Sequence, residues 1–251
     1  MYLSLNSVKK YAVFVMLLAI PAVLLAKAGE RTGSPVSFQT PDGVIITGTY
    51  HAPAGPRMKT FILLHGLGST NEEWQSFAVH LVRAGYGFLA YDARGHGKSV
   101  FTRDGKQLSY ENFVPSQWNL MIQDVGSAVS FLMNEKKIQE KRIGLIGASM
   151  GANVSMLYAA SNEAVPMVVL LSPGVNYVLF NISNAVSSFQ KRPVAIAVSP
   201  NDTYAYQSSQ LLFRKIEMNK RAVLLTAAKG HGVEMFDGRF ERRLLQWIAK
   251  Y

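Results

Sequence analysis

The sequence predicts an α/β protein. One mostly parallel sheet of about eight strands begins with an antiparallel hairpin and carries helices on both faces. Short apolar runs alternate along the chain with longer stretches in which apolar residues recur at helical spacing. A Pro41-Asp42-Gly43 turn precedes the first of these runs. The chain has 251 residues, of which 49% are hydrophobic, so it is long enough for one such domain and too apolar for disorder.

The strands are predicted from the apolar runs and from one turn. Residues 36–40 and 44–51 are rich in β-forming side chains and flank the Pro41-Asp42-Gly43 turn, which indicates a hairpin. The runs that follow are apolar throughout, as in strands that a parallel sheet buries on both faces. These strands are expected over residues 60–64, 87–91, 142–146, 168–171, 194–198 and 223–226.

The segments between these runs have the periodicity of amphipathic helices. Trp74, Phe77 and Leu81, for example, recur at helical spacing. Strands and helices that alternate in this way form one sheet with a helix layer on each face. Residues 29–251 are therefore expected to form a single domain. Its helices are expected over residues 72–84, 117–134, 150–160, 204–218 and 240–249.

The first 28 residues have the features of an export signal. Lys9 and Lys10 precede an apolar stretch over residues 11–26, and Ala26-Lys27-Ala28 places small residues at alternate positions, as a signal peptidase requires. We expect cleavage after Ala28 and an exported domain, either periplasmic or secreted. The alternative is an uncleaved signal anchor, in which residues 11–26 hold the domain to the membrane outside the cytoplasm. Contact with a membrane is expected only in that second case.

Charge and composition exclude several classes of function. Removal of residues 1–28 takes away three lysines and no acid, so the net charge falls from +10 to +7. The remaining basic residues are scattered and form no nucleic-acid-binding motif, so no nucleic-acid partner is expected. The absence of cysteine excludes disulfides, thiolate zinc sites and a cysteine nucleophile. No HExxH, GxGxxG or Walker motif occurs, so neither a metal nor a cofactor is expected.

Gly147-Ala148-Ser149-Met150-Gly151 forms a G-x-S-x-G motif between a predicted strand and a predicted helix. In this context a sharp turn projects the serine hydroxyl above the sheet, and glycine is needed on both sides because side chains there would meet neighbouring backbone. Ser149 is therefore the candidate nucleophile, supported by Gly147 and Gly151.

His65-Gly66-Leu67-Gly68 follows the strand over residues 60–64. Its small residues, Gly66 and Gly68, allow the backbone to approach the serine. The backbone N–H groups of Leu67 and Met150 are the expected oxyanion-hole donors. His65 is expected to support this loop structurally.

His231 and Asp202 are the candidate partners of the serine. His231 lies between two glycines after the last predicted strand, and Asp202 follows the strand over residues 194–198. The chain order of serine, aspartate and histidine is that of hydrolases with a nucleophile elbow. Other carboxylates could orient the imidazole if the loop carrying Asp202 points elsewhere. These alternatives are Asp124, Glu234 and Asp237.

Together, these motifs resemble those of the α/β-hydrolase superfamily over residues 36–251. The segment YDARGHGKS, residues 91–99, is similar to the D-x-R-G-H-G-x-S segment of members that resemble monoacylglycerol lipases and serine aminopeptidases. Many such relatives carry a large cap, whereas here only residues 173–192 are available for one. A minimal cap is therefore expected, with residues 99–115 as a second cover. The candidates to contact the substrate are Leu67, Met150, Trp74, Trp118, Val175 and Tyr177. For the two tryptophans, which lie at helical spacing among apolar neighbours, packing in the core is the favoured interpretation.

The function expected from these residues is hydrolysis of a small-molecule carboxylic ester through an acyl-serine intermediate. Thioester hydrolysis and the hydrolysis of small amides or peptides are alternatives within the same fold. An alternative of another class is a binding protein that keeps the hydrolase fold without turnover. Ester chain length, leaving group and oligomeric state are left open by the sequence.

Overall fold

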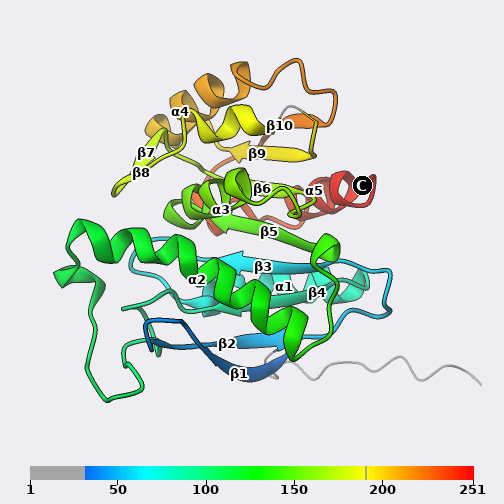
Figure 1. The fold of residues 1–251 in the computed structure, drawn as a ribbon. Coiled ribbons are helices and arrows are strands. Elements are labelled where there is room, and N and C mark those ends of the chain that lie inside the picture. Colours follow the sequence, from blue (N-terminus) through cyan, green and yellow to red (C-terminus); the bar gives the residue numbers. More distant parts are fainter. Residues whose placement is uncertain (1–31, 190) are drawn as a thin grey trace, which may run out of the picture. The chain divides into compact units, whose positions relative to one another are not determined.

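The computed structural model describes residues 32–189 and 191–251 (Figure 1). The predicted export segment, residues 1–28, lies outside the described residues. Among the residues that are described, no helix combines the length and apolar character needed to cross a membrane.

The core of the fold is an eight-stranded sheet with the strand order β1-β2-β4-β3-β5-β6-β9-β10. The hairpin of β1 and β2 is antiparallel, β2 also runs antiparallel to β4, and all remaining pairs are parallel. The predicted mostly parallel sheet with an antiparallel start is thereby confirmed. The strands are β1 Ser34–Gln39, β2 Ile45–His51, β3 Thr60–Leu64, β4 Gly87–Tyr91, β5 Ile143–Ala148, β6 Val168–Leu171, β9 Val194–Val198 and β10 Ala222–Thr226.

Helices cover both faces of this sheet (Figure 1). β3 divides its side chains between the two layers: Phe61 and Leu63 join the cluster that contains α1 and α5, whereas Ile62 and Leu64 join the cluster that contains α2 and α3. Because side chains on both faces of β3 are buried, its sequence is apolar throughout. The helices are α1 Gln75–Arg83, α2 Pro115–Asn134, α3 Met150–Ser161, α4 Thr203–Arg214 and α5 Phe240–Ile248.

Two helix boundaries differ from the predictions by more than two residues. The expected helix over residues 72–84 begins as a 3-10 turn, η1 Asn71–Trp74, because the Thr70 side chain accepts the N–H of Glu72 and tightens the first turn. The helix expected to reach residue 218 ends at Arg214, after which the N–H of Ile216 bonds to the carbonyl of Phe213 in a tighter turn. Neither difference moves a candidate site residue.

The strand order brings the candidate site residues to one edge of the sheet. The carboxyl ends of parallel strands meet at the same edge, where ligands bind in open α/β sheets. β5 lies in the middle, β3 adjoins it on one side, and β6 with β9 follows on the other. The segment after β3 therefore approaches Ser149 from one side, and the segments after β6, β9 and β10 approach it from the other.

Two short segments follow the carboxyl ends of β6 and β4. Residues 173–192 contain a small antiparallel hairpin, β7 Asn176–Tyr177 and β8 Phe180–Asn181, followed by the 3-10 turn η4 Ala185–Ser188. Residues 99–115 hold two isolated bridges, Val44 with Thr102 and Phe101 with Gln107, and the 3-10 turn η2 Tyr110–Asn112.

Candidate active site

Ser149 occupies a strained turn between β5 and α3. Its backbone has φ 53° and ψ −120°, a region that residues other than glycine seldom adopt. The turn is held because the N–H of Ser149 donates to the carbonyl of Leu171 at 2.8 Å. A Cβ at Gly147 would lie 2.2 Å from the Gly151 oxygen, and a Cβ at Gly151 would lie 2.3 Å from the Leu64 oxygen. Both glycines are therefore required by the close approach of neighbouring backbone.

The loop after β3 lies directly beside Ser149. A Cβ built at Gly66 would come within 3.5 Å of the Ser149 Cβ, while Gly68 has a positive φ of 72°. Within residues 32–189 and 191–251, no hydrogen bond is recorded for the N–H of Leu67. Met150 is the first residue of α3, so its N–H has no partner inside the helix. These two N–H groups can donate hydrogen bonds to a negatively charged oxygen beside the serine.

A carboxylate that the sequence reasoning missed supports this loop. Glu73, in η1, accepts the N–H of Gly66 at 3.2 Å, and the Ser69 side chain lies beside its carboxyl. Burial raises the pKa of the Glu73 carboxyl, while Ser69, the N–H of Gly66 and the nearby His231 oppose that rise. No motif marks Glu73, because its contact depends on how η1 packs against the loop.

His231 and Asp202 are in direct contact. The His231 Nδ1 lies 2.6 Å from an Asp202 carboxylate oxygen, with Asp202 preceding α4 and His231 following β10. A carboxylate can only accept, so Nδ1 carries the hydrogen and Nε2 keeps a free lone pair. The loop that carries His231 is anchored by the next residue, because the N–H of Gly232 donates to the buried Ser172 hydroxyl at 2.9 Å.

The other three carboxylates that were alternatives to Asp202 have different partners. Glu234 accepts the backbone N–H of His231 at 3.3 Å. Asp237 accepts two backbone N–H groups at the start of α5, each at 2.8 Å. Asp124 is paired with Arg94. Asp202 is therefore the carboxylate that the structure places against the imidazole.

Tyr177, from β7, contacts both Ser149 and His231. The Tyr177 hydroxyl lies next to the Ser149 side chain, and the Tyr177 ring meets the His231 ring edge-on with centroids 6.3 Å apart. The sequence indicated Tyr177 only as a candidate substrate contact. Its contact with the serine could not be read from a strand of two residues.

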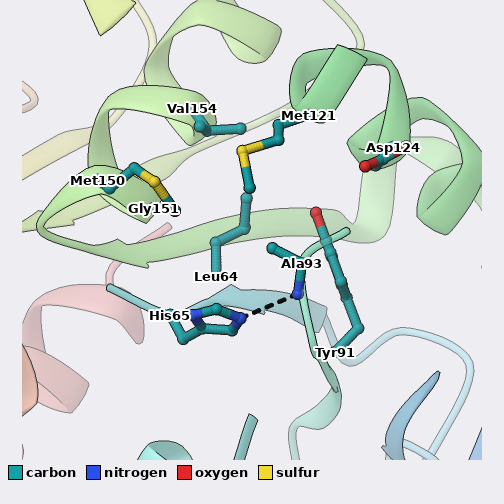
Figure 2. Close-up of a pocket in the computed structure, with 9 residues that line it drawn as sticks. All are labelled: Leu64, His65, Tyr91, Ala93, Met121, Asp124, Met150, Gly151 and Val154. Atoms are coloured by element: carbon teal, nitrogen blue, oxygen red, sulfur yellow. Dashed lines mark hydrogen bonds between the residues drawn. The ribbon is translucent and has the colours of Figure 1, made fainter. Parts of the chain in front are cut away.

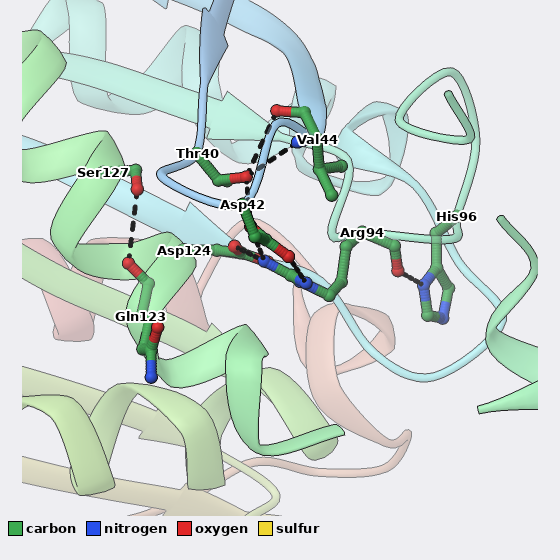
Figure 3. A network of polar contacts seen from close by, with 8 residues as sticks. All are labelled: Thr40, Asp42, Val44, Arg94, His96, Gln123, Asp124 and Ser127. Atoms are coloured by element: carbon green, nitrogen blue, oxygen red, sulfur yellow. Dashed lines mark hydrogen bonds and ion pairs between the residues drawn. The ribbon is translucent and has the colours of Figure 1, made fainter. Parts of the chain in front are cut away.

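The YDARGHGKS segment joins three parts of the chain through Arg94 (Figure 3). The guanidinium donates to Asp124 on α2 at 2.7 and 2.5 Å and to Asp42 in the β1–β2 turn at 2.8 and 3.1 Å. Arg94 and Asp124 are 3% and 1% exposed, so this ion pair is almost fully desolvated. The network fixes the base of the site and places no group against Ser149.

Residues 55–232 match the model of a protein family, Hydrolase_4, described as serine aminopeptidase, S33. The chain belongs to this family. The resemblance to the α/β-hydrolase superfamily that the motifs indicated is thereby confirmed for most of the described chain.

Relatives and solved structures agree with this membership. The Pyrococcus furiosus esterase structure has a TM-score of 0.71 with this α/β hydrolase at 23% identity, covering 87% of this chain and 92% of that one. A putative hydrolase of Bacillus subtilis is 33% identical over 107 residues, which are 41% of this chain and 34% of its own length. Protein phosphatase methylesterase 1 of Candida albicans is 26% identical over 172 residues, 66% of this chain and 43% of its own length. The chain spans half or less of the curated relatives it matches.

A small cavity lies behind the start of α3 in this S33 family member (Figure 2). Its wall is mostly apolar and includes Met150, the residue after the serine. The lining residues are Leu64, His65, Tyr91, Ala93, Met121, Asp124, Met150, Gly151 and Val154. Among the described residues, no group of three or more histidine, cysteine or acidic side chains could hold a metal ion.

His65 borders this cavity, and both of its ring nitrogens are hydrogen-bonded to backbone groups. Its Nε2 accepts the N–H of Ala93 at 2.9 Å, so Nδ1 carries the hydrogen and donates to the Gly66 carbonyl at 2.7 Å (Figure 2). Burial lowers the pKa of His65 to about 4, with the neighbouring His96 acting in the same direction. The neutral imidazole thus ties the loop after β3 to the segment after β4.

The neutral state of His65 predicts a loss of stability in acid. The unfolded imidazole has a pKa of 6.5 and the folded one a pKa of about 4. Lowering the pH through this window protonates the unfolded chain first and should cost about 3 kcal/mol of unfolding free energy. Urea denaturation at pH 7 and pH 4.5 measures most of this change, about 2 kcal/mol. Between these two pH values, the free energy of unfolding should fall less for H65Q than for the unmodified protein, and H80Q should behave like the unmodified protein. An equal fall for H65Q and the unmodified protein would contradict the assignment.

Proposed function

We propose that the protein hydrolyses carboxylic esters of small molecules, with Ser149 as nucleophile and an acyl-serine intermediate. The observation that carries the proposal is the 2.6 Å contact between His231 and Asp202 at the sheet edge where Ser149 precedes α3. Hydrolase family membership and esterase-like neighbours support the same class of reaction.

In the proposed mechanism, the Ser149 oxygen attacks the acyl carbonyl while the His231 Nε2 removes the serine proton. Asp202 holds the imidazole through Nδ1 and stabilises the imidazolium that forms. His231 then gives the proton to the departing alcohol, the carbon–oxygen bond breaks, and the acyl group stays on Ser149. Water, activated by His231, releases the acid in the reverse sequence of proton transfers.

The N–H groups of Leu67 and Met150 would receive the negative charge on the carbonyl oxygen. Loss of one such donor typically costs about 2.7–4 kcal/mol of transition-state stabilisation. The Glu73 carboxylate favours this arrangement because it restrains the loop at Gly66, one residue before Leu67.

Two other functions are compatible with parts of the site. Thioesters and small amides use the same acyl-serine chemistry, and the residues of the site give no strong preference among them. A binding protein without turnover would have no need for the strained backbone of Ser149, whose cost of about 1–3 kcal/mol is typical of functional positions. The ester hydrolase is therefore the favoured function.

A panel of p-nitrophenyl esters with acyl chains of increasing length tests the proposal. We expect Ser149-dependent release of p-nitrophenol, with a preferred chain length that also reports the size of the acyl site. Release that is the same for the unmodified protein and S149A, or no release from any ester, would reject the ester hydrolase.

Replacing Asp202 with asparagine should lower kcat by about 10⁴-fold. The amide cannot fix the Nδ1–H tautomer of His231 or stabilise the imidazolium, although its size is nearly unchanged. Steady-state kinetics with the preferred ester measure the effect. The control is D237N, at a carboxylate that caps α5. Near-normal turnover by D202N would assign the orienting role to another residue.

Export of the domain also belongs to this proposal. Residues 1–28 are proposed to direct the chain out of the cytoplasm, with cleavage after Ala28 or retention as an anchor. Cell fractionation followed by N-terminal sequencing of the mature protein distinguishes these two outcomes from a chain that keeps residues 1–28 in the cytoplasm.

A further inference from the structure

Tyr177 is held beside the nucleophile by contacts that are independent of any substrate. The Tyr204 hydroxyl on α4 accepts the backbone N–H of Asn176 at 3.1 Å and donates to its carbonyl at 2.9 Å. The rings of Tyr177 and Tyr204 meet edge-on with centroids 5.4 Å apart. A Cβ at Gly174 would lie 2.8 Å from both rings, so the glycine makes room for the pair. The Tyr204 hydroxyl thus fastens the short hairpin to α4 at Asn176, the residue before Tyr177.

The turn after Tyr177 carries backbone strain. Val178 has φ 57°, a conformation that a β-branched residue rarely adopts, and Leu179 next to it is 49% exposed. Strain of this kind is retained where neighbouring contacts hold the backbone in its conformation, and it is most common at functional sites. The two-residue turn therefore fixes the position of the Tyr177 side chain instead of leaving it on a loose loop.

The position of Tyr177 relative to the strands identifies the side of the site on which it acts. The oxyanion donors come from the loop after β3 and from the start of α3. Tyr177 follows β6, and its ring meets the ring of His231, which follows β10. Because β3 and β6 lie on opposite sides of β5, Tyr177 lies on the side of the histidine and away from the Leu67 donor. In the proposed reaction this is the side on which the alcohol leaves.

Tyr177 also keeps its proton. Burial raises the pKa of the Tyr177 hydroxyl, and the nearby Asp202 and Tyr204 raise it further, with only the neighbouring Ser149 side chain opposing them. The phenol can therefore act as a hydrogen-bond donor across the neutral pH range.

We propose that the Tyr177 hydroxyl donates a hydrogen bond to the leaving-group oxygen while the ester is cleaved, an inference that rests on the function proposed above. In the resting site this hydroxyl lies next to Ser149, and the Tyr177 ring contacts the ring of His231. When the tetrahedral intermediate collapses, the bond from carbon to the leaving oxygen breaks and its electron pair moves onto that oxygen. His231 supplies the proton, and Tyr177 stabilises the developing charge without transferring its own proton.

This role favours substrates whose leaving group is a basic alcohol. An alkoxide that develops on an alkyl ester accepts a strong hydrogen bond, whereas p-nitrophenolate is weakly basic and departs with little assistance. The active site is accordingly suited to alkyl esters, and the benefit of the Tyr177 hydroxyl should grow with the basicity of the departing oxygen.

The test compares two esters with the same acyl group, one ethyl and one p-nitrophenyl, in the unmodified protein and in Y177F. kcat/KM is the quantity measured, because it reports acylation and is independent of the later hydrolysis of the shared acyl-enzyme. For Y177F we expect kcat/KM to fall about 10- to 100-fold for the ethyl ester and less than about threefold for the p-nitrophenyl ester.

Y206F is the matched control, since it removes the hydroxyl of a different tyrosine, on α4. Its kcat/KM should be unchanged for both esters. An equal loss for both esters in Y177F, or no loss for either, would overturn the role of Tyr177 while leaving the ester hydrolase in place. If the unmodified protein cleaves neither ester in a Ser149-dependent way, the proposed function itself fails and the role of Tyr177 falls with it.

Discussion

Alanine in place of Ser149 is expected to reduce ester turnover by about 10⁵- to 10⁶-fold, the loss seen when a serine nucleophile is removed from a working triad. The substitution deletes one oxygen and leaves the strained turn, both flanking glycines and the Leu171 contact in place. The fold should therefore be preserved. Turnover is measured with the preferred p-nitrophenyl ester, and circular dichroism together with the melting temperature checks the fold.

A serine at the far end of α3 provides the control. Ser161 ends α3, is exposed, and bonds only to carbonyls of its own helix. S161A should retain full turnover. An S149A protein that folds normally and keeps more than a small fraction of the activity would show that another group attacks the ester.

Replacing Arg94 with methionine is expected to lower the free energy of unfolding by about 3–5 kcal/mol, as when one partner of a buried ion pair is removed. The reason is Asp124, which is 1% exposed and would be left as a buried carboxylate without its cation. Burial already raises the pKa of Asp124, and the Arg94 hydrogen bond and charge are what oppose that rise. Urea denaturation at neutral pH measures the loss.

Two further variants separate the charge from the packing. R94M combined with D124N should recover part of the stability, because the amide needs no counter-charge. R243M removes an exposed arginine that donates to the Thr226 carbonyl, and it should cost less than about 1 kcal/mol. A loss below 1 kcal/mol for R94M would show that the network contributes little to folding.

The sheet could be predicted almost entirely from the sequence, because buried parallel strands are apolar throughout. The runs over residues 60–64, 87–91, 168–171 and 194–198 coincide with β3, β4, β6 and β9. Ser149 was recognisable for a related reason: a serine between two glycines after a strand has a defined local geometry. These signals are local, so a single sequence contains them.

Contacts between distant segments could not be predicted in this way. Glu73 looks like an ordinary acid in a first helical turn, and only the packing of η1 brings it to Gly66. Tyr177 lies in a two-residue strand too short for any periodicity, and its hairpin is joined to α4 by the Tyr204 hydroxyl, which bonds to the backbone of Asn176. Asp202 was the candidate from the sequence, but only the structure separates it from Asp124, because Asp202 contacts His231 whereas Asp124 is paired with Arg94.

The central claim is that Ser149 is an activated nucleophile, and covalent labelling tests it most directly. The unmodified protein is treated with a fluorophosphonate, which reacts with serines activated by a neighbouring base, and the modified peptide is located by mass spectrometry. We predict one stoichiometric label on Ser149, lost in S149A and strongly slowed in D202N. A protein that remains unlabelled, or a label on another residue that persists in S149A, would contradict the claim.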